Sequence, residues 1–179
     1  MHVLLVRHGE WKWRRGRDEG DYPLSPKGRA LASTVRRVLI REDLKPDAYL
    51  TTCWRHAQDT AKVLRGRDTR AAMVDVVGLT PKTAESQFTW RGILKEARSQ
   101  GVTITDATTL AFVGHEPRLR QLCERVTGVD LIEIARLEVI VLEAKSVQSL
   151  LRRRAKVERR LAASAGGRGR PRLKTRARV

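Results

Sequence analysis

The chain has 179 residues, of which 41% are hydrophobic and 32% are charged, which suits one globular domain with its own core. It has no apolar run of about 18 residues, and its two cysteines, Cys53 and Cys123, form no C-x-x-C pair. The sequence therefore predicts a cytoplasmic protein with no membrane span, disulfide framework or thiolate zinc site.

The formal net charge of +17 arises from 37 Lys and Arg residues against 20 Asp and Glu residues. Residues 152–179 hold twelve of these basic residues and one acid, Glu158, which amounts to +11. After residue 161 this segment is too poor in apolar side chains to offset the entropy of ordering. We predict a domain over 1–150, then a basic helix end and a disordered Arg/Gly-rich tail over 151–179. The tail is either a polyanion-binding arm or a solvated extension.

Strands and helices alternate along the chain. The apolar run 2–6 predicts a strand buried on both faces, and Ser25-Pro26 is a helix start. Further strands are predicted over 47–52, 71–77, 109–113 and 137–142, and further helices over 55–64, 84–99, 118–127 and 147–161. This order predicts an α/β fold with three layers, α/β/α, around a mostly parallel central sheet.

Two of the predicted strands end in a histidine beside a glycine. Arg7, His8 and Gly9 follow the first strand, and Gly114-His115 follows the strand over 109–113. Ligands of open α/β sheets bind beyond the carboxyl ends of the strands, so we expect both histidines at one site. The glycines permit a ligand to approach the backbone closely, which makes Gly9 a candidate substrate-binding residue.

These residue types suit a tetrahedral phosphate. The strand over 47–52 would bring Arg55, at the start of a helix, to the same edge as Arg7. Arginine pairs bidentately with oxyanions, and a helix N-terminus adds N–H donors. A neutral imidazole in such a pocket can attack phosphorus while nearby cations stabilise the transferring group. There is no carboxylate cluster to hold a metal, so we predict no metal ion and no cofactor.

Four segments also match known motifs in order and spacing. They read L-V-R-H-G-E at 5–10, P-L-S-P-K-G at 23–28, R-H-A-Q-D-T-A at 55–61 and L-A-F-V-G-H-E-P at 110–117. Together they resemble the R-H-G, pLTpkG and RAxQTA motifs of the histidine phosphatase superfamily, also called phosphoglycerate-mutase-like. The fourth segment resembles the vvGHeP motif of its SixA-type phosphohistidine phosphatase branch. The resemblance covers residues 1–144.

This resemblance implies a phosphoglycerate-mutase-like fold and a metal-independent phosphatase. His8 would be the nucleophile that becomes phosphorylated, while Arg7, Arg55 and His115 would bind the phosphoryl group. One departure lies in the third segment, where Thr60-Ala61 follows Arg55 one position later than the family pattern has it. We predict a structural or solvated role for His56.

A second departure concerns the general acid. Mutase members carry a carboxylate after the third strand, whereas here only Glu85 and Glu10 are candidates. SixA-type members also lack this acid, and an imidazole leaving group needs less protonation than an alkoxide. We therefore expect a SixA-like phosphohistidine phosphatase acting on a phosphorylated protein. The alternatives are a small-molecule or nucleotide phosphomonoesterase, and a non-catalytic protein that binds polyanions through residues 152–179.

Overall fold

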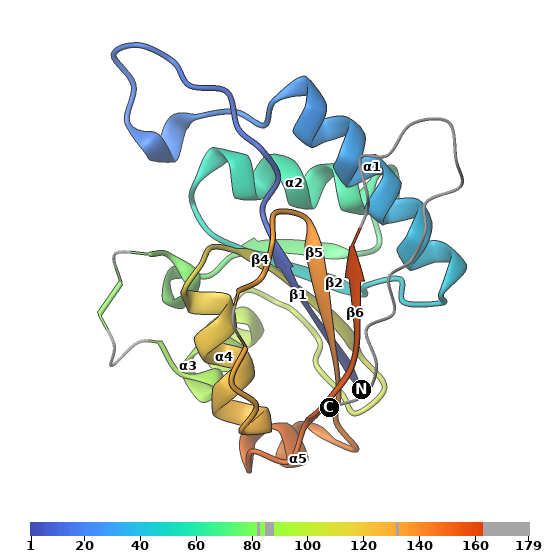
Figure 1. Ribbon diagram of the computed structural model, residues 1–179. Coiled ribbons are helices and arrows are strands. Elements are labelled where there is room, and N and C mark those ends of the chain that lie inside the picture. The colour runs from blue at the N-terminus through green and yellow to red at the C-terminus, as the bar shows by residue number, and fades with distance from the viewer. Residues whose placement is uncertain (82, 85–87, 132, 163–179) are drawn as a thin grey trace.

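The computed structural model describes residues 1–81, 83–84, 88–131 and 133–162, which form a six-stranded sheet between two layers of helices (Figure 1). The strand order is β3-β2-β4-β1-β5-β6. The first four of these strands in the order are parallel to one another, β5 runs antiparallel to β1, and β6 runs antiparallel to β5. This confirms the predicted α/β fold with a mostly parallel sheet. The strands are β1 (His2–Arg7), β2 (Ala48–Thr51), β3 (Ala72–Asp75), β4 (Thr109–Gly114), β5 (Glu138–Glu143) and β6 (Lys156–Ala162).

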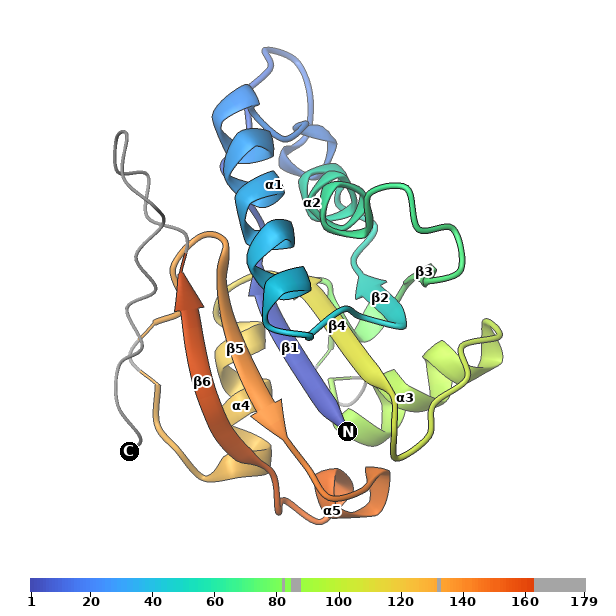
Figure 2. The same cartoon turned by 90° about the vertical axis from the view of Figure 1, so that its right-hand side faces the viewer.

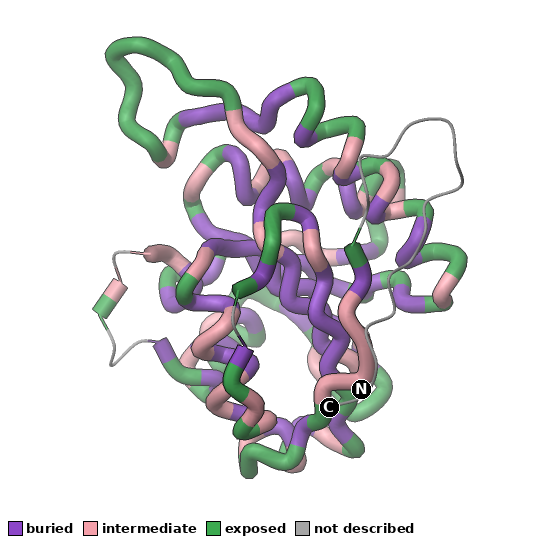
Figure 3. Tube along the Cα trace, viewed as in Figure 1, coloured by how far each residue is buried: buried purple, intermediate pink, exposed green. Residues whose placement is uncertain are grey.

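Helices cover both faces of the sheet (Figure 2). One face packs against α1 (Pro26–Arg41) and α2 (Arg55–Arg65), and the other against α3 (Trp90–Ser99), α4 (Arg118–Thr127) and α5 (Val147–Leu151). Alternate side chains of β1 enter the two cores, so residues 3–6 of the predicted apolar run are buried. The burial of the central strands is visible in Figure 3. Two short 3₁₀ turns, η1 (Glu19–Asp21) and η2 (Val77–Leu79), complete the described elements.

The helix starts follow local capping chemistry. Ser25 caps α1 by accepting a hydrogen bond from the Gly28 amide at 2.9 Å, with Pro26 in the first position, as predicted. The helix predicted from residue 84 begins later, at Trp90, because the Thr89 hydroxyl accepts from the Gly92 amide at 3.0 Å and caps it there.

The predicted helix over 147–161 is wrong. Helix α5 ends at Leu151, and the chain then forms β6, which pairs antiparallel with β5. Two of the basic residues on β6 are neutralised by acids of the domain: Arg159 Nη1 lies 3.0 Å from Glu42 Oε2, and Arg160 Nε lies 2.8 Å from Glu138 Oε1. Part of the segment read as a basic appendage is therefore an edge strand, and charged side chains are common on such edges.

The domain boundary predicted at residue 150 accordingly cuts through the sheet, which extends to Ala162. The disordered tail predicted beyond that point lies outside the described residues. Within the described part of the chain, no helix is long and apolar enough to cross a membrane.

Candidate active site

His8 and His115 meet at one edge of the sheet. Strands β1 and β4 are parallel neighbours with Arg7 opposite Gly114, so the residues that follow the two strands emerge side by side. The His8 amide donates to the Gly114 carbonyl at 3.0 Å, and the two imidazole centroids lie 4.8 Å apart. Both side chains are buried. The structure thus brings together the two histidines that were predicted to share a site because each follows a strand.

The loop that carries His8 also orients its ring. The Nδ1 atom of His8 lies 2.8 Å from the carbonyl oxygen of Gly9, and because a carbonyl only accepts, Nδ1 is the donor. In the neutral imidazole this leaves Nε2 unprotonated on the opposite side of the ring. A Cβ on Gly9 would lie 2.8 Å from Leu24 Cδ1, so a larger residue here would require the Leu24 side chain to shift.

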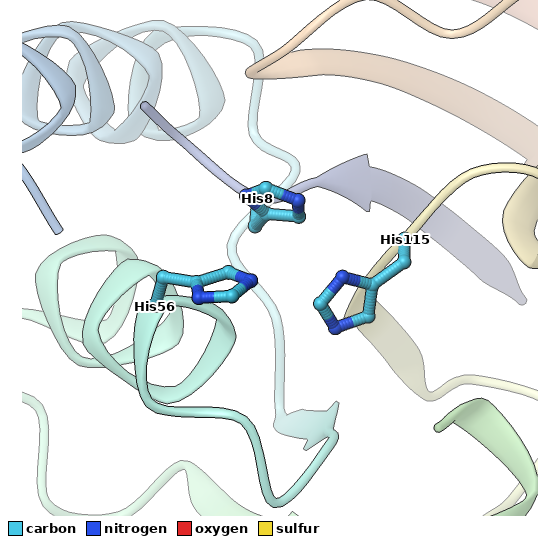
Figure 4. A group of neighbouring side chains, drawn as sticks. All are labelled: His8, His56 and His115. Carbon is cyan, nitrogen blue, oxygen red and sulfur yellow. The ribbon is translucent and has the colours of Figure 1, made fainter. Parts of the chain in front are cut away.

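A third histidine, His56, lies at the centre of the site (Figure 4). Its ring centroid is 4.3 Å from that of His8 and 5.2 Å from that of His115. The side chain is fully buried, and its Nδ1 donates to the carbonyl oxygen of Tyr22 at 3.2 Å. Its Nε2 is buried without a hydrogen-bond partner among the described residues. The structure therefore places in the site a residue for which the sequence predicted a structural or solvated role.

The position of Thr60 explains why His56 points inward. The Thr60 hydroxyl accepts a hydrogen bond from the Gly9 amide at 3.1 Å and donates to the His56 carbonyl oxygen at 2.7 Å. When Thr60-Ala61 is aligned with the last two residues of the RAxQTA pattern, His56 falls at the arginine of that pattern. The one-residue offset visible in the sequence was the signal that could have identified His56.

The two predicted arginines occupy different environments. Arg55 is the first residue of α2 and is exposed, and its guanidinium makes no hydrogen bond or ion pair with the residues described here. The structure does not bring it into the histidine group. Arg7 is mostly buried, and its Nη1 donates to Glu133 Oε1 at 2.6 Å and to the Ile134 carbonyl at 2.9 Å. Of the two, only Arg7 is close enough to disfavour protonation of His8.

Burial keeps all three imidazoles neutral. Burial, followed by the charge of His56, lowers the pKa of His8 to about 3. Burial likewise lowers the pKa of His56 to about 4, although the hydrogen bond to Tyr22 opposes it. Burial, followed by the charge of His8, lowers the pKa of His115 to about 2. At neutral pH the site therefore presents imidazole lone pairs rather than imidazolium cations.

Thr52 and Trp54 hold His115 in place. Thr52 Oγ1 accepts a hydrogen bond from the Trp54 amide at 3.2 Å and lies 3.1 Å from Nε2 of His115. The Trp54 ring stands edge-on to the His115 ring, with centroids 4.7 Å apart. These contacts come from the segment between β2 and α2, so the same segment positions both His56 and His115.

Trp11 and Arg136 form a second side of the site. The Trp11 ring centroid lies 6.3 Å from that of His56, and the Arg136 guanidinium lies 5.8 Å from the Trp11 centroid. Arg136 is exposed, and its charge acts on both His8 and His56. Sequence reasoning missed Arg136 because it stands just before β5, outside any of the matched motifs.

Neither predicted acid is shown in a position to protonate a leaving group. The Ser25 hydroxyl donates to Glu10 Oε1 at 3.0 Å, and Lys27 Nζ lies 3.4 Å from Oε2. The hydrogen bond from Ser25, helped by Lys27, lowers the pKa of Glu10, so this carboxyl is ionised at neutral pH. Glu85 lies outside the described residues.

The site thus combines a parallel α/β sheet, an arginine–histidine–glycine turn after the first strand, and a second histidine from the adjacent strand. The model of the histidine phosphatase superfamily (branch 1) matches residues 3–79 of this chain. The matched region includes Arg7, His8 and α2, and ends before His115. Comparison with the sequences of curated proteins gives no match.

Solved structures share the fold at low sequence identity. A structure assigned as phosphohistidine phosphatase SixA from Agrobacterium tumefaciens is 19% identical, with a TM-score of 0.68 over 90% of this chain and 97% of that chain. A protein histidine phosphatase SixA complexed with tungstate is 14% identical, with a TM-score of 0.71 over the same shares of both chains. A mycobacterial glucosyl-3-phosphoglycerate phosphatase is 18% identical, with a TM-score of 0.57 over 79% of this chain and 90% of that chain.

Proposed function

We propose that this protein is a phosphatase that uses His8 as its nucleophile and needs no metal ion for the transfer. The observation that carries the proposal is the hydrogen bond from His8 Nδ1 to the Gly9 carbonyl at 2.8 Å. It fixes the tautomer in which Nε2 holds the lone pair, and burial keeps that nitrogen unprotonated at neutral pH. The match of residues 3–79 to the model of the histidine phosphatase superfamily supports the same role.

The reaction takes two steps. In the first, Nε2 of His8 attacks phosphorus, a P–N bond forms, and the bond from phosphorus to the leaving group breaks. Arg7 and His115 hold the phosphoryl oxygens, His115 by donating a ring N–H, and Gly9 lets the substrate approach the backbone. Arg55 is exposed at the start of α2, and its side chain would turn toward the bound phosphoryl group to contact it. In the second step water attacks phosphorus, the P–N bond breaks, orthophosphate leaves and the imidazole of His8 is restored.

We propose phosphohistidine on a protein as the substrate. Glu10 is held as a carboxylate by Ser25 and Lys27, which leaves it poorly suited to protonate an alkoxide. Expulsion of imidazole from a phosphoramidate requires less proton donation, so a site in which Glu10 stays ionised suits this substrate better. The two SixA structures similar to this chain support the proposal, and the tungstate in one of them is a tetrahedral oxyanion like phosphate.

The test compares a phosphohistidine peptide with p-nitrophenyl phosphate and sugar phosphates, in buffer containing a chelator. We expect the phosphohistidine peptide to be hydrolysed most efficiently, and His8→Ala to abolish turnover. His2→Ala is the matched control, because His2 begins β1 and lies outside the histidine group. Unchanged turnover in His8→Ala would exclude His8 as the nucleophile, and a clear preference for alkyl monoesters would replace the substrate with a small-molecule ester.

A further inference from the structure

The three imidazoles of the site form a compact group from three different elements. His8 follows β1, His56 lies in the first turn of α2 and His115 follows β4. One ring nitrogen from each of them lies within 4.8 Å of the others, and all three side chains are buried. Figure 4 shows the rings of His56 and His115 turned toward His8.

Backbone carbonyls fix the free nitrogen of two of these rings. His8 Nδ1 donates to Gly9 at 2.8 Å and His56 Nδ1 donates to Tyr22 at 3.2 Å, so both Nε2 atoms hold lone pairs in the neutral rings. The Nε2 of His56 is buried with no partner among the described residues. A histidine that donates one ring N–H to a carbonyl while the other nitrogen stays free has the arrangement typical of a metal ligand.

His115 supplies the third nitrogen. Its Nε2 lies 3.1 Å from Oγ1 of Thr52. A hydroxyl can both donate and accept, so Thr52 can accept a hydrogen bond from Nε2–H. In the tautomer that donates Nε2–H to Thr52, the lone pair of His115 is on Nδ1 and is available to a metal ion; in the other tautomer Thr52 donates to Nε2, and Nδ1–H is available to a phosphoryl oxygen. One nitrogen of each ring then lies within 4.8 Å of the others, at the place where an RAxQTA pattern would put an arginine.

Lone pairs that converge in this way attract a Lewis acid. Neutral imidazole suits zinc, copper and nickel, and three histidines with a fourth open position is a known zinc arrangement. Tetrahedral zinc with bonds of about 2.0–2.1 Å holds its nitrogens about 3.3 Å apart, so the rings must move closer by small side-chain rotations.

We propose that His8, His56 and His115 together bind one divalent transition-metal ion, Zn²⁺ being the one to test first. Binding of the metal and phosphoryl transfer exclude each other, because Nε2 of His8 cannot coordinate zinc and attack phosphorus at the same time. The exclusion rests on the proposed function, whereas the metal site itself does not. Zinc would therefore act as an inhibitor that leaves when phosphate or a chelator competes for the site.

The metal site is tested without any substrate. The metal-free full chain is titrated with Zn²⁺ against a chromophoric chelator, and Co²⁺ is added separately to record its visible absorption. We expect one equivalent of zinc bound with a Kd below about 1 µM, and a tetrahedral cobalt spectrum. His56→Gln should weaken binding at least about 100-fold, since even loss of an outer-shell partner costs 10–100-fold.

Two matched variants keep the result interpretable. His2→Gln removes the one histidine outside the group, and Cys53→Ser removes the exposed thiol, so both should bind zinc as the parent does. Circular dichroism confirms that each variant is folded. Zinc bound equally well by folded His56→Gln, or no zinc bound by the parent, would overturn the proposal. A parent that binds zinc but hydrolyses no phosphate in chelated buffer would instead overturn the proposed function alone.

Discussion

The hydroxyl of Thr60 joins helix α2 to the loop after β1 by accepting the amide of Gly9 at 3.1 Å. The same hydroxyl donates to the His56 carbonyl at 2.7 Å, one turn back along the helix. This pair of bonds sets the rotation of α2 relative to the His8 loop, and that rotation directs His56 inward and leaves Arg55 exposed. The identity of the residue that faces His8 thus follows from a threonine four positions further along the chain.

Replacing Thr60 with valine keeps the shape of the side chain and removes both hydrogen bonds. The Gly9 amide is then left without its buried acceptor, which costs about 1–3 kcal/mol. We expect chemical denaturation to show a loss of that size, together with lower phosphatase turnover, because Gly9 orients the His8 ring. Thr34→Val is the control, since Thr34 Oγ1 also donates four residues back, to Ala30 at 3.3 Å, but lies away from the site on α1. Equal losses in both variants would contradict a special role for Thr60.

Replacing His56 with arginine restores the family pattern at this position. A guanidinium there would add charge-assisted hydrogen bonds to an oxyanion, each worth about 1.5–3 kcal/mol, or a factor of about 10–100 in affinity. We expect inhibition of the phosphatase reaction by orthophosphate and tungstate to strengthen by at least about tenfold, and zinc binding to be lost.

Arg55→Ala is the matched comparison for that experiment. Because Arg55 is exposed and His56 is central, the alanine variant should change oxyanion affinity less than His56→Arg does. If Arg55→Ala abolishes oxyanion binding while His56→Arg leaves it unchanged, then Arg55 is the phosphate clamp, as the RAxQTA resemblance implied. Thermal unfolding of each variant shows whether the fold tolerates the substitution.

The sequence alone predicted those elements whose position depends on a local property, such as apolar patterning or helix capping. The run 2–6 is apolar on both faces because β1 is buried between two helical layers, and Ser25-Pro26 caps its helix through contacts local to the chain. Strand β6 could not be found in this way. Its charged side chains resemble a solvated helix until β5 supplies the ladder partner and Glu42 and Glu138 supply counter-charges.

The site residues also differ in whether local sequence or tertiary contacts determine their position. His8 and His115 each come directly after a strand and beside a glycine. Because the two strands are parallel neighbours, the topology alone brings these histidines together. His56 depends on the rotation of a helix, which is set by a contact between Thr60 and Gly9 that are distant in sequence. A shift of one residue in reading the helix start exchanges the inward residue for an exposed one, and only tertiary contacts resolve that choice.

The buried histidines predict how stability depends on pH. Each has a folded pKa, about 3 for His8, 4 for His56 and 2 for His115, below the unfolded value of 6.5. The unfolded chain therefore binds more protons below pH 6.5, so stability is complete above that pH and is lost as the pH falls toward 4. Nearby Arg7 and Arg136 act in the same direction, because their positive charges also oppose protonation of His8.

We expect each histidine to contribute a loss of roughly 2 kcal/mol between pH 7 and pH 5, before coupling among them. Urea denaturation in chelated buffer at a series of pH values measures this. His56→Gln should show a shallower decline than the parent, and His2→Gln should leave the contribution of the buried group intact. A parent whose unfolding free energy is flat from pH 7 to 5 would show that the site histidines are already protonated or solvated.

Gly28 sets how closely α1 approaches the loop that follows β1. A Cβ at this position would collide with the carbonyl oxygen of Glu10, a backbone atom that cannot move without displacing the residues after His8. Overpacking of this kind costs about 1–3 kcal/mol, and we expect Gly28→Ala to lose that stability and to lower phosphatase turnover as the loop shifts. Gly20→Ala is the control, because its Cβ would meet only the Trp54 ring at the ordinary distance of 3.4 Å. Calorimetry measures the stability of the two variants, and a phosphatase assay measures their turnover. A Gly28→Ala protein with parental stability and activity would show that this contact does not set the position of the loop.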